Sequence, residues 1–396
     1  MKNEIENDEQ ESQVKEDDVK EILESTKIDK NRLSNIEPVD VEVISKDDQK
    51  IQQLYSEFSS FLETSADIIS DSGVKTVIPT GIDLLDAILG GGLACGTMCI
   101  IVGPPGGGKT MLAAQIGGSI QVEFPGSIVA YLDSEEAITT TRLYNLGVKR
   151  PKIKPYSDVT VEKVFKFLEG LCLFKEQKKI IDIPSIVVWD SIANTLSQKE
   201  READDINSVI GYKARMLSIL VPKYVSKLSK YNICLVAVNQ LRDLIQIGNF
   251  TPAKEMKFMP TGKEMPGGNI LKFNAFQLIY MKINSILDSK KEGFSGVVVE
   301  LKCVKNKLFS PNIPIQLVGN FLIGFSNFWS NYKFLVENKR LSSGAWNYLI
   351  TLPNKKFRTL DAENLYKDDQ VFKQTFDEVV KDTIQKEIVD KNVVPV

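Results

Sequence analysis

The chain of 396 residues contains no histidine. Its absence removes the most common general base of enzyme active sites and the most common zinc ligand. Any acid–base chemistry must therefore come from carboxylates, lysines or tyrosines. Enrichment in isoleucine, lysine and asparagine, as AT-rich coding produces, explains the lack of histidine more simply than selection against it.

Long apolar runs and closely spaced cysteine pairs are also lacking. No apolar stretch approaches the ~20 residues of a membrane-spanning helix, and the first segment is acidic, unlike a secretory leader. We therefore expect a cytoplasmic protein with no membrane partner. The cysteines include no Cys-x-x-Cys pair and lie mostly within apolar runs, which predicts reduced core residues. They are Cys95, Cys99, Cys172, Cys234 and Cys303.

Acidic residues are concentrated at the start of the chain. Residues 1–50 hold 16 Asp and Glu against 8 Lys and Arg, whereas residues 51–396 hold 36 acidic and 41 basic residues. An acidic arm of this kind is typical of solvated, disordered chain. The alternative is that the arm competes with a polyanion for the basic surface of the body.

Apolar periodicity predicts an α/β protein. Apolar residues at helical spacing indicate an amphipathic helix over residues 51–69, which covers either its own body or a neighbouring subunit. Farther on, β-type runs alternate with helical stretches, which predicts a mostly parallel sheet. The predicted strands are 98–102, 128–133, 186–190, 233–238, 275–283 and 297–304, and two later helices are 328–340 and 372–388.

Four regions follow from this pattern. Residues 1–50 are expected to form a disordered acidic arm, and residues 51–75 an N-terminal helical segment. The α/β core spans residues 76–325, and residues 326–396 form a small α-rich C-terminal domain. A single main core agrees with the length of the chain, because single cores usually stop growing at about 250–300 residues.

A glycine-rich phosphate loop follows the first predicted strand of the core. Residues 103–110 read GPPGGGKT, which matches G-x-x-x-x-G-K-[ST] between a strand and a helix. Backbone N–H groups there bind phosphate oxygens, the lysine reaches the outer phosphates, and the hydroxyl joins the Mg²⁺ shell. The motif predicts ATP and Mg²⁺ as cofactors. The predicted binding residues are Gly103, Gly106, Gly107, Gly108, Lys109, Thr110 and Met111.

Carboxylates end two further predicted strands. One strand ends at Asp190, where a carboxylate can act on Mg²⁺ together with Thr110. The other ends at Asp133, and strand alternation places Asp133 and Glu135 on one face. We expect Glu135 to polarise the attacking water and Glu136 to be a surface charge.

A long polar segment covers residues 239–273 and begins at the end of an apolar strand. It carries lysines together with methionines and phenylalanines, which is unusual for a segment too polar to be core. We expect a mobile loop on the end of a buried strand. Next to a nucleotide site, such a loop indicates a binding surface that ATP controls.

Together these motifs resemble the RecA family of strand-exchange recombinases, and more specifically its phage-type members such as UvsX. The similarity extends over residues 80–346. The most specific motifs are NQLR at 239–242, PGGN at 266–269 and VKNK at 304–307. The resemblance implies a RecA-type P-loop ATPase core with a mostly parallel sheet. It also implies that the N-terminal helix at residues 51–75 is an oligomerisation helix.

The resemblance also implies a role for each matching residue. Glu135 is the expected catalytic carboxylate, and Lys109 acts on the outer phosphates. Gln240 is expected to sense the γ-phosphate and relay ATP occupancy to the loop that follows. Lys305 and Lys307 are expected to reach the ATP of the adjacent subunit, so that hydrolysis requires a homo-oligomeric helical filament.

Two DNA-binding loops follow from the same resemblance, at residues 202–210 and 241–266. Binding of single-stranded DNA needs basic side chains for phosphates and apolar or aromatic groups at base steps. The candidate DNA-binding residues are Arg215, Arg242, Ile247, Phe250, Lys254, Lys257, Phe258, Lys263, Gly267, Gly268 and Asn269.

The chain departs from the bacterial pattern in three places. Its second DNA loop is longer, so no single apolar side chain can be assigned to the DNA. Arg142 occupies the position where the family usually has an adenine-stacking tyrosine, and a guanidinium can also stack on a purine. The acidic segment is at the N-terminus of the chain, whereas bacterial members carry theirs at the C-terminus.

We therefore expect a DNA-dependent ATPase that pairs single-stranded DNA with a homologous duplex and exchanges the strands. A recombination mediator and a single-stranded-DNA-binding protein are further candidate partners, and the compartment is the cytoplasm of a bacterium or phage-infected host. One alternative is a RecA-core hexameric helicase or KaiC-like ATPase. Another is a mediator that binds ATP and a recombinase without exchanging strands.

Overall fold

The computed structural model divides the chain into two compact units, residues 1–70 and 71–396. The structure describes Gln53 and residues 74–136, 138–148, 158–205, 209, 211–243, 257–287 and 294–392. The predicted acidic arm, and the predicted helix at 51–69 apart from Gln53, lie outside the described residues. The helices and strands named below belong to the second unit. None of the described helices combines the length and the apolar character needed to cross a membrane.

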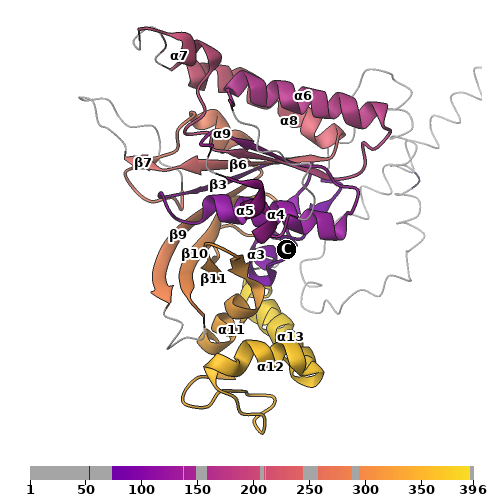
Figure 1. Ribbon diagram of the computed structural model, residues 1–396, viewed down its shortest axis with the longest axis vertical. Coiled ribbons are helices and arrows are strands. Elements are labelled where there is room, and N and C mark those ends of the chain that lie inside the picture. Colours follow the sequence, from indigo (N-terminus) through magenta and orange to yellow (C-terminus); the bar gives the residue numbers. More distant parts are fainter. Residues whose placement is uncertain are drawn as a thin grey trace, which may run out of the picture. The chain divides into compact units, whose positions relative to one another are not determined.

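The second unit contains a mixed sheet of eight strands (Figure 1). The strand order in this sheet is β12-β11-β10-β9-β3-β6-β5-β4. The strands β9, β3, β6, β5 and β4 are parallel to one another, which confirms the predicted α/β class. Their bounds are β3 Met98–Gly103, β4 Val129–Asp133, β5 Ser185–Asp190, β6 Ile233–Gln240 and β9 Gln277–Leu287.

An antiparallel extension continues the sheet beyond β9. It consists of β10 (Gly296–Asn306), β11 (Pro314–Asn320) and β12 (Gly324–Ser326). The sequence pattern predicted the run at 297–304 as part of a mostly parallel sheet, whereas β10 is antiparallel to β9. The connection between β9 and β10 is too short for the crossover that a parallel pair requires.

Alternate residues of β3 belong to two hydrophobic cores. Cys99 and Ile101 face a core that includes α3 (Asp83–Leu89) and α4 (Lys109–Glu123). Met98, Ile100 and Val102 face a second core. That core includes α6 (Val161–Gln177), α8 (Tyr212–Lys230) and the short α9 (Asn269–Asn274). Helices therefore cover both faces of the sheet (Figure 1).

A third core, which is rich in aromatic residues, holds the C-terminal helices together. The two predicted helices are confirmed as α11 (Asn327–Glu337) and α13 (Gln370–Ile384), and a π-helical turn, Gln385–Val389, continues α13. Phe328, Phe372 and Phe376 pack in this core beside α12 (Ala362–Asp368). The division of the chain at residues 50, 75 and 325 stays a prediction.

Short elements complete the second unit. They are β1 Val77–Ile78, β2 Leu93–Ala94, α5 Thr140–Asn145, α7 Gln198–Glu202, β7 Arg242–Asp243, β8 Lys263–Glu264, β13 Leu341–Ser342, β14 Tyr348–Leu349 and η2 Thr359–Asp361. All five cysteines are free and buried, as predicted for core residues. Burial raises the pKa of Cys303 to about 12, which keeps its thiol protonated.

Candidate nucleotide site and nucleic-acid loops

The carboxyl ends of four parallel strands bring the predicted nucleotide residues together. In the strand register Gly103 lies opposite Gln240, and Asp133 lies opposite Asp190. Ligands of open α/β sheets bind at this edge of the sheet. Residues from four separate stretches of sequence therefore meet at one place.

The phosphate loop adopts a backbone that glycine makes possible. Gly106 and Gly108 have positive φ angles of 73° and 83°. A Cβ at Gly103 would lie only 2.0 Å from the Met281 carbonyl oxygen of β9. Helix α4 begins at Lys109, and Gly108 gives it no side-chain cap. The first N–H groups of α4 therefore need another acceptor, and phosphate oxygens suit them.

A buried lysine and a buried carboxyl group flank this loop. Lys109 Nζ donates to the Pro104 carbonyl oxygen at 2.7 Å. Burial lowers the pKa of Lys109, and the carboxylates of Asp190 and Glu135 oppose this shift. Tyr131 Oη donates to Asp190 Oδ2 at 2.6 Å. Burial raises the pKa of Asp190 to about 6, although hydrogen bonds from Tyr131 and the Thr110 side chain oppose the rise.

These groups fit a nucleotide phosphate with a divalent cation. A buried ammonium is stabilised by an anion and a buried carboxylate by a cation, so both ligands would offset burial costs. Among the described residues, no group of three or more His, Cys, Asp or Glu side chains could hold a metal ion. A cation held by Thr110 and Asp190 would therefore depend on phosphate oxygens for further ligands.

Glu135 is held by donors from two other strand ends. Its Oε1 accepts hydrogen bonds from Ser191 Oγ at 2.9 Å, Asn194 Nδ2 at 2.6 Å and Gln240 Nε2 at 3.5 Å. The structure thus brings Glu135 and Gln240 into contact, as their predicted roles require. The Asp190–Ser191 peptide bond in this network is cis.

The turn after β4 differs from the predicted continuation of the strand. β4 ends at Asp133, whose carboxylate accepts from the backbone N–H groups of Glu135 at 3.0 Å and Ile138 at 2.8 Å. Strand alternation therefore does not set the direction of Glu135. A hydrogen-bonded turn does so instead. Glu136, with a φ angle of 55°, is exposed, as expected for a surface charge.

Two of the predicted cofactor-binding residues lie outside the phosphate loop. Met111 is 1% exposed and packs in the core, where its side-chain methyl group would lie 3.5 Å from a Cβ added at Gly108 of the loop. Arg142 lies in α5, where its backbone N–H is capped by Thr139 Oγ1 at 3.2 Å. Its side chain is partly exposed. Both assignments stay predictions.

The lysine pair lies at the opposite edge of the sheet. β10 is antiparallel to β9, and β9 is parallel to β3, so the end of β10 lies far from Gly103 along the strands. Lys305 Nζ donates to the carbonyl oxygens of Lys272 at 2.8 Å and Phe273 at 2.7 Å. Lys307 Nζ lies 5.5 Å from the ring centroid of Phe276. From this position, neither lysine can reach the nucleotide site of its own chain.

The second predicted DNA loop has a closed base. Asn239 Nδ2 donates to the Pro266 carbonyl oxygen at 2.8 Å, and β7 pairs with β8. Within that stem, Lys263 forms an ion pair with Asp243 at 2.6 Å, which reduces the charge it offers to a phosphate. Ile247, Phe250 and Lys254 lie outside the described residues.

The later part of this loop packs on the body. Phe258 is partly buried against the second core, and Lys257 Nζ lies 5.0 Å from its ring centroid. Gly267 has a φ angle of 99°, and Gly268 precedes Asn269, the first residue of α9. Insertion of Phe258 into DNA would require it to leave this packing, and the DNA role of these residues stays a prediction.

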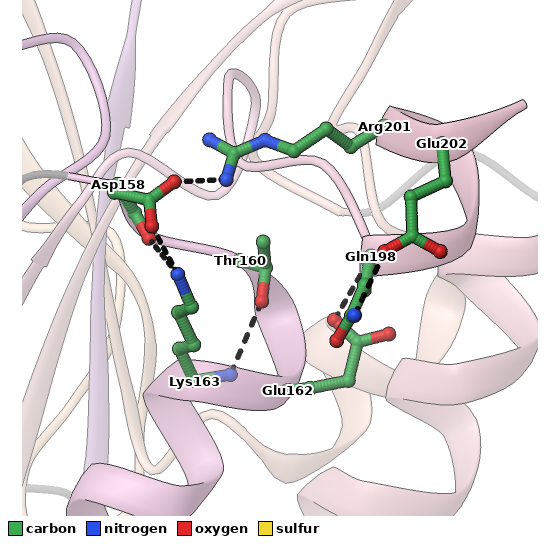
Figure 2. A network of polar contacts seen from close by, with 7 residues as sticks. All are labelled: Asp158, Thr160, Glu162, Lys163, Gln198, Arg201 and Glu202. Carbon is green, nitrogen blue, oxygen red and sulfur yellow. Dashed lines mark hydrogen bonds and ion pairs between the residues drawn. The ribbon is translucent and has the colours of Figure 1, made fainter.

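A polar network holds the start of the first predicted DNA loop (Figure 2). The Asp158 carboxylate accepts from both Lys163 of α6 and Arg201 of α7. The Gln198 backbone N–H donates to Glu162 Oε2 at 2.9 Å, which ties α7 to the start of α6. Residues 206–208 and 210 lie outside the described residues. Arg215 is exposed in the first turn of α8, where a phosphate could reach it.

Three side chains of the site were not predicted from the sequence. Tyr131 supports Asp190, Asn194 supports Glu135, and Lys213 Nζ donates to the Ala193 carbonyl oxygen at 3.1 Å. Tyr131 and Asp190 are 59 positions apart, and only the pairing of β4 with β5 brings them together. The position of Asn194 shortly after Asp190 was the one available signal.

Comparisons with known proteins identify relatives of the chain. A family profile described as the RecA N-terminal domain matches residues 51–321. Protein RecA of Borrelia duttonii is 30% identical over 272 residues, which are 68% of this chain and 70% of that protein. Protein RecA of Geobacter metallireducens is 30% identical over 68% of this chain and 74% of its own. For Protein RecA of Thermus thermophilus, the values are 31%, 59% and 64%.

Proposed function

The chain belongs to the RecA family, and from this we propose that it is an ATP-dependent DNA recombinase. It forms helical filaments on single-stranded DNA and exchanges that strand with a homologous duplex. Relatives named RecA favour this function over a hexameric helicase, a KaiC-like ATPase or a non-exchanging mediator. The phage-type assignment, the mediator and the single-stranded-DNA-binding partner remain predictions.

One observation carries the proposal. Gln240 contacts the Glu135 carboxylate and is the last residue of β6, directly before the loop that begins with β7. A side chain that touches the expected catalytic group is therefore attached to the expected DNA-binding loop. This arrangement can link nucleotide state to DNA binding, as in other γ-phosphate switches.

Each residue of the site has a distinct role in the proposed hydrolysis. Bound Mg²⁺ would neutralise the charge that develops on the phosphates. Lys109 and the N–H groups at the start of α4 orient the phosphates, and Asp190, held by Tyr131 and Thr110, supplies a fixed negative charge. Glu135 orients the attacking water and can accept its proton. Gln240 responds to the γ-phosphate and moves the base of the second loop.

The test is the substitution Lys109→Ala. We expect DNA-stimulated ATP hydrolysis to fall by about 100-fold or more, because a preorganised phosphate contact is lost. Strand exchange between single-stranded DNA and a homologous duplex should disappear with it. Lys381→Ala, which removes an exposed lysine from α13, is the matched control and should retain both activities. A wild-type chain that forms no filaments on single-stranded DNA with ATP would refute the proposal.

A further inference from the structure

The segment at residues 191–195 joins the catalytic carboxylate to the rest of the site. Asn194 Nδ2 donates to Glu135 Oε1 at 2.6 Å, a shorter contact than the 3.5 Å contact from Gln240. Thr195 closes the segment into a turn, because its N–H donates to the Ser191 carbonyl oxygen at 3.1 Å. A shift of this turn would therefore move the Asn194 amide and change the direction of the carboxylate.

Lys213 connects the same turn to the first predicted DNA loop. Its ammonium group donates to the Ala193 carbonyl oxygen at 3.1 Å, and its backbone N–H donates to Glu200 Oε1 at 3.3 Å. Glu200 is fixed in turn, because its carboxylate accepts from Ser197, the cap of α7. Lys213 thus contacts both the catalytic turn and α7.

The end of the second predicted loop lies near this lysine as well, because a Cβ added at Gly268 would be 3.6 Å from the Cβ of Ala214, the neighbour of Lys213. Burial lowers the pKa of Lys213 to about 8; the charge of Glu200 opposes the shift, and that of Arg242 adds to it. Arg242 is the first residue of β7, in the stem of the second loop. Movement of either loop would change the electrostatic surroundings of the Lys213 ammonium group.

We propose that Asn194 and Lys213 are positioning residues that couple the two DNA loops to Glu135. The inference rests on the proposed function, since it explains how DNA stimulates hydrolysis. DNA that engages α7 or the end of the second loop moves the start of α8 and Lys213. Lys213 then moves the Ala193 carbonyl group, and the adjacent Asn194 turns the Glu135 carboxylate toward the water. Misplacement of a catalytic group by about 1 Å can lower the rate by roughly 100-fold.

The substitution Lys213→Met tests the coupling, because methionine keeps an apolar stem and removes the donor. We expect kcat with single-stranded DNA to fall about tenfold, the size of a lost hydrogen bond to a charged group. The KM for ATP and the affinity for a labelled single-stranded oligonucleotide should stay within about twofold, since the Lys213 ammonium group is engaged by the Ala193 carbonyl oxygen. Lys230→Met, at the other end of α8, is the matched control and should behave as wild type.

The substitution Asn194→Ala is a second test of the coupling. Because Asn194 is exposed, the kcat of this variant can be measured even where Lys213→Met fails to fold. It should lower kcat to a similar extent, and the double variant should be no slower than the slower single variant, because both act through one link. Unchanged kcat in Asn194→Ala, or additive losses in the double variant, would overturn the coupling. A wild-type chain without DNA-stimulated hydrolysis would instead refute the proposed function.

Discussion

Asp86 illustrates at the residue scale how one partly buried carboxyl group makes stability depend on pH. Its Oδ1 accepts from the Thr80 N–H at 2.8 Å and the Thr80 hydroxyl at 2.7 Å. Burial nevertheless raises its pKa from 3.8 to about 7, and the charge of Asp83 adds to the rise. Between these two pH values the folded chain binds more protons than the unfolded chain. Stability contributed by this group is therefore present at low pH and is lost as the pH rises toward 7.

The substitution Asp86→Asn removes the charge and keeps an oxygen for Thr80. We expect the free energy of unfolding at pH 8 to increase by about 2 kcal/mol and its decline between pH 4 and 7 to become shallower. Urea unfolding at pH 5 and pH 8 measures both. Asp368→Asn, in the exposed last turn of α12, should leave the pH dependence as it is. An Asp86→Asn variant with the wild-type pH slope would show that burial of this group is not the cause.

Close contact between elements decides which glycines the chain needs. Gly118 lies in the interior of α4, where an added Cβ would be 2.6 Å from the backbone carbon of Gly147, in the segment after α5. Gly170 lies in α6, and an added Cβ there would have no atom within 4 Å. The same residue type therefore serves packing in one helix and has no such role in the other.

This contrast gives opposite predictions for one chemical change. Gly118→Ala should lower the free energy of unfolding by roughly 1–3 kcal/mol, because α4 and the Gly147 segment must move apart. Gly170→Ala should raise it by up to about 1 kcal/mol, because alanine favours the helix and meets no neighbour. Urea unfolding of both variants measures the difference. Equal effects of the same sign would indicate that helix propensity alone decides both positions.

At the scale of the whole molecule, the nucleotide loop and the lysine pair lie at opposite edges of one sheet. Lys305 and Lys307 cannot reach Lys109 of their own chain, because β10 ends away from the edge where β3 ends. A head-to-tail contact between two copies would bring the two edges together. Such a contact does not close on itself unless the rotation forms a ring, so it is suited to a filament.

Mixing two inactive variants tests this arrangement. Lys109→Ala removes the lysine of the phosphate loop. The double substitution Lys305→Ala with Lys307→Ala removes the two lysines that are expected to reach the nucleotide site of the neighbouring subunit. Each variant alone should show little DNA-stimulated hydrolysis. A 1:1 mixture should recover up to about one quarter of the wild-type rate, because random assembly joins an intact loop to an intact pair in about one interface in four.

The controls for this mixture are the two variants measured separately at the same total concentration. Recovery should require single-stranded DNA, since assembly on DNA creates the interfaces. A mixture no more active than the sum of its components would indicate that the lysine pair does not act on a neighbouring nucleotide site.

Much of this protein was predictable from the sequence, because local patterns have local causes. The alternation of β-type and helical stretches predicted the α/β sheet, and the GPPGGGKT motif predicted a loop between β3 and α4. The strand end at Asp190 was also predicted, whereas β6 continues two residues past its predicted end at residue 238, to Gln240. Periodicity and turn residues depend on neighbours in the chain, so they can be recognised without the fold.

Only the tertiary structure decided which distant groups meet. The pairing of β4 with β5 places Tyr131 on Asp190, and the turn after β5 places Asn194 on Glu135. The antiparallel direction of β10, which moves Lys305 away from the nucleotide loop, also depends on pairing with β9. The physical reason is that such contacts depend on strand order, direction and burial, which are properties of the packed chain, while a motif records only the spacing of residues along it.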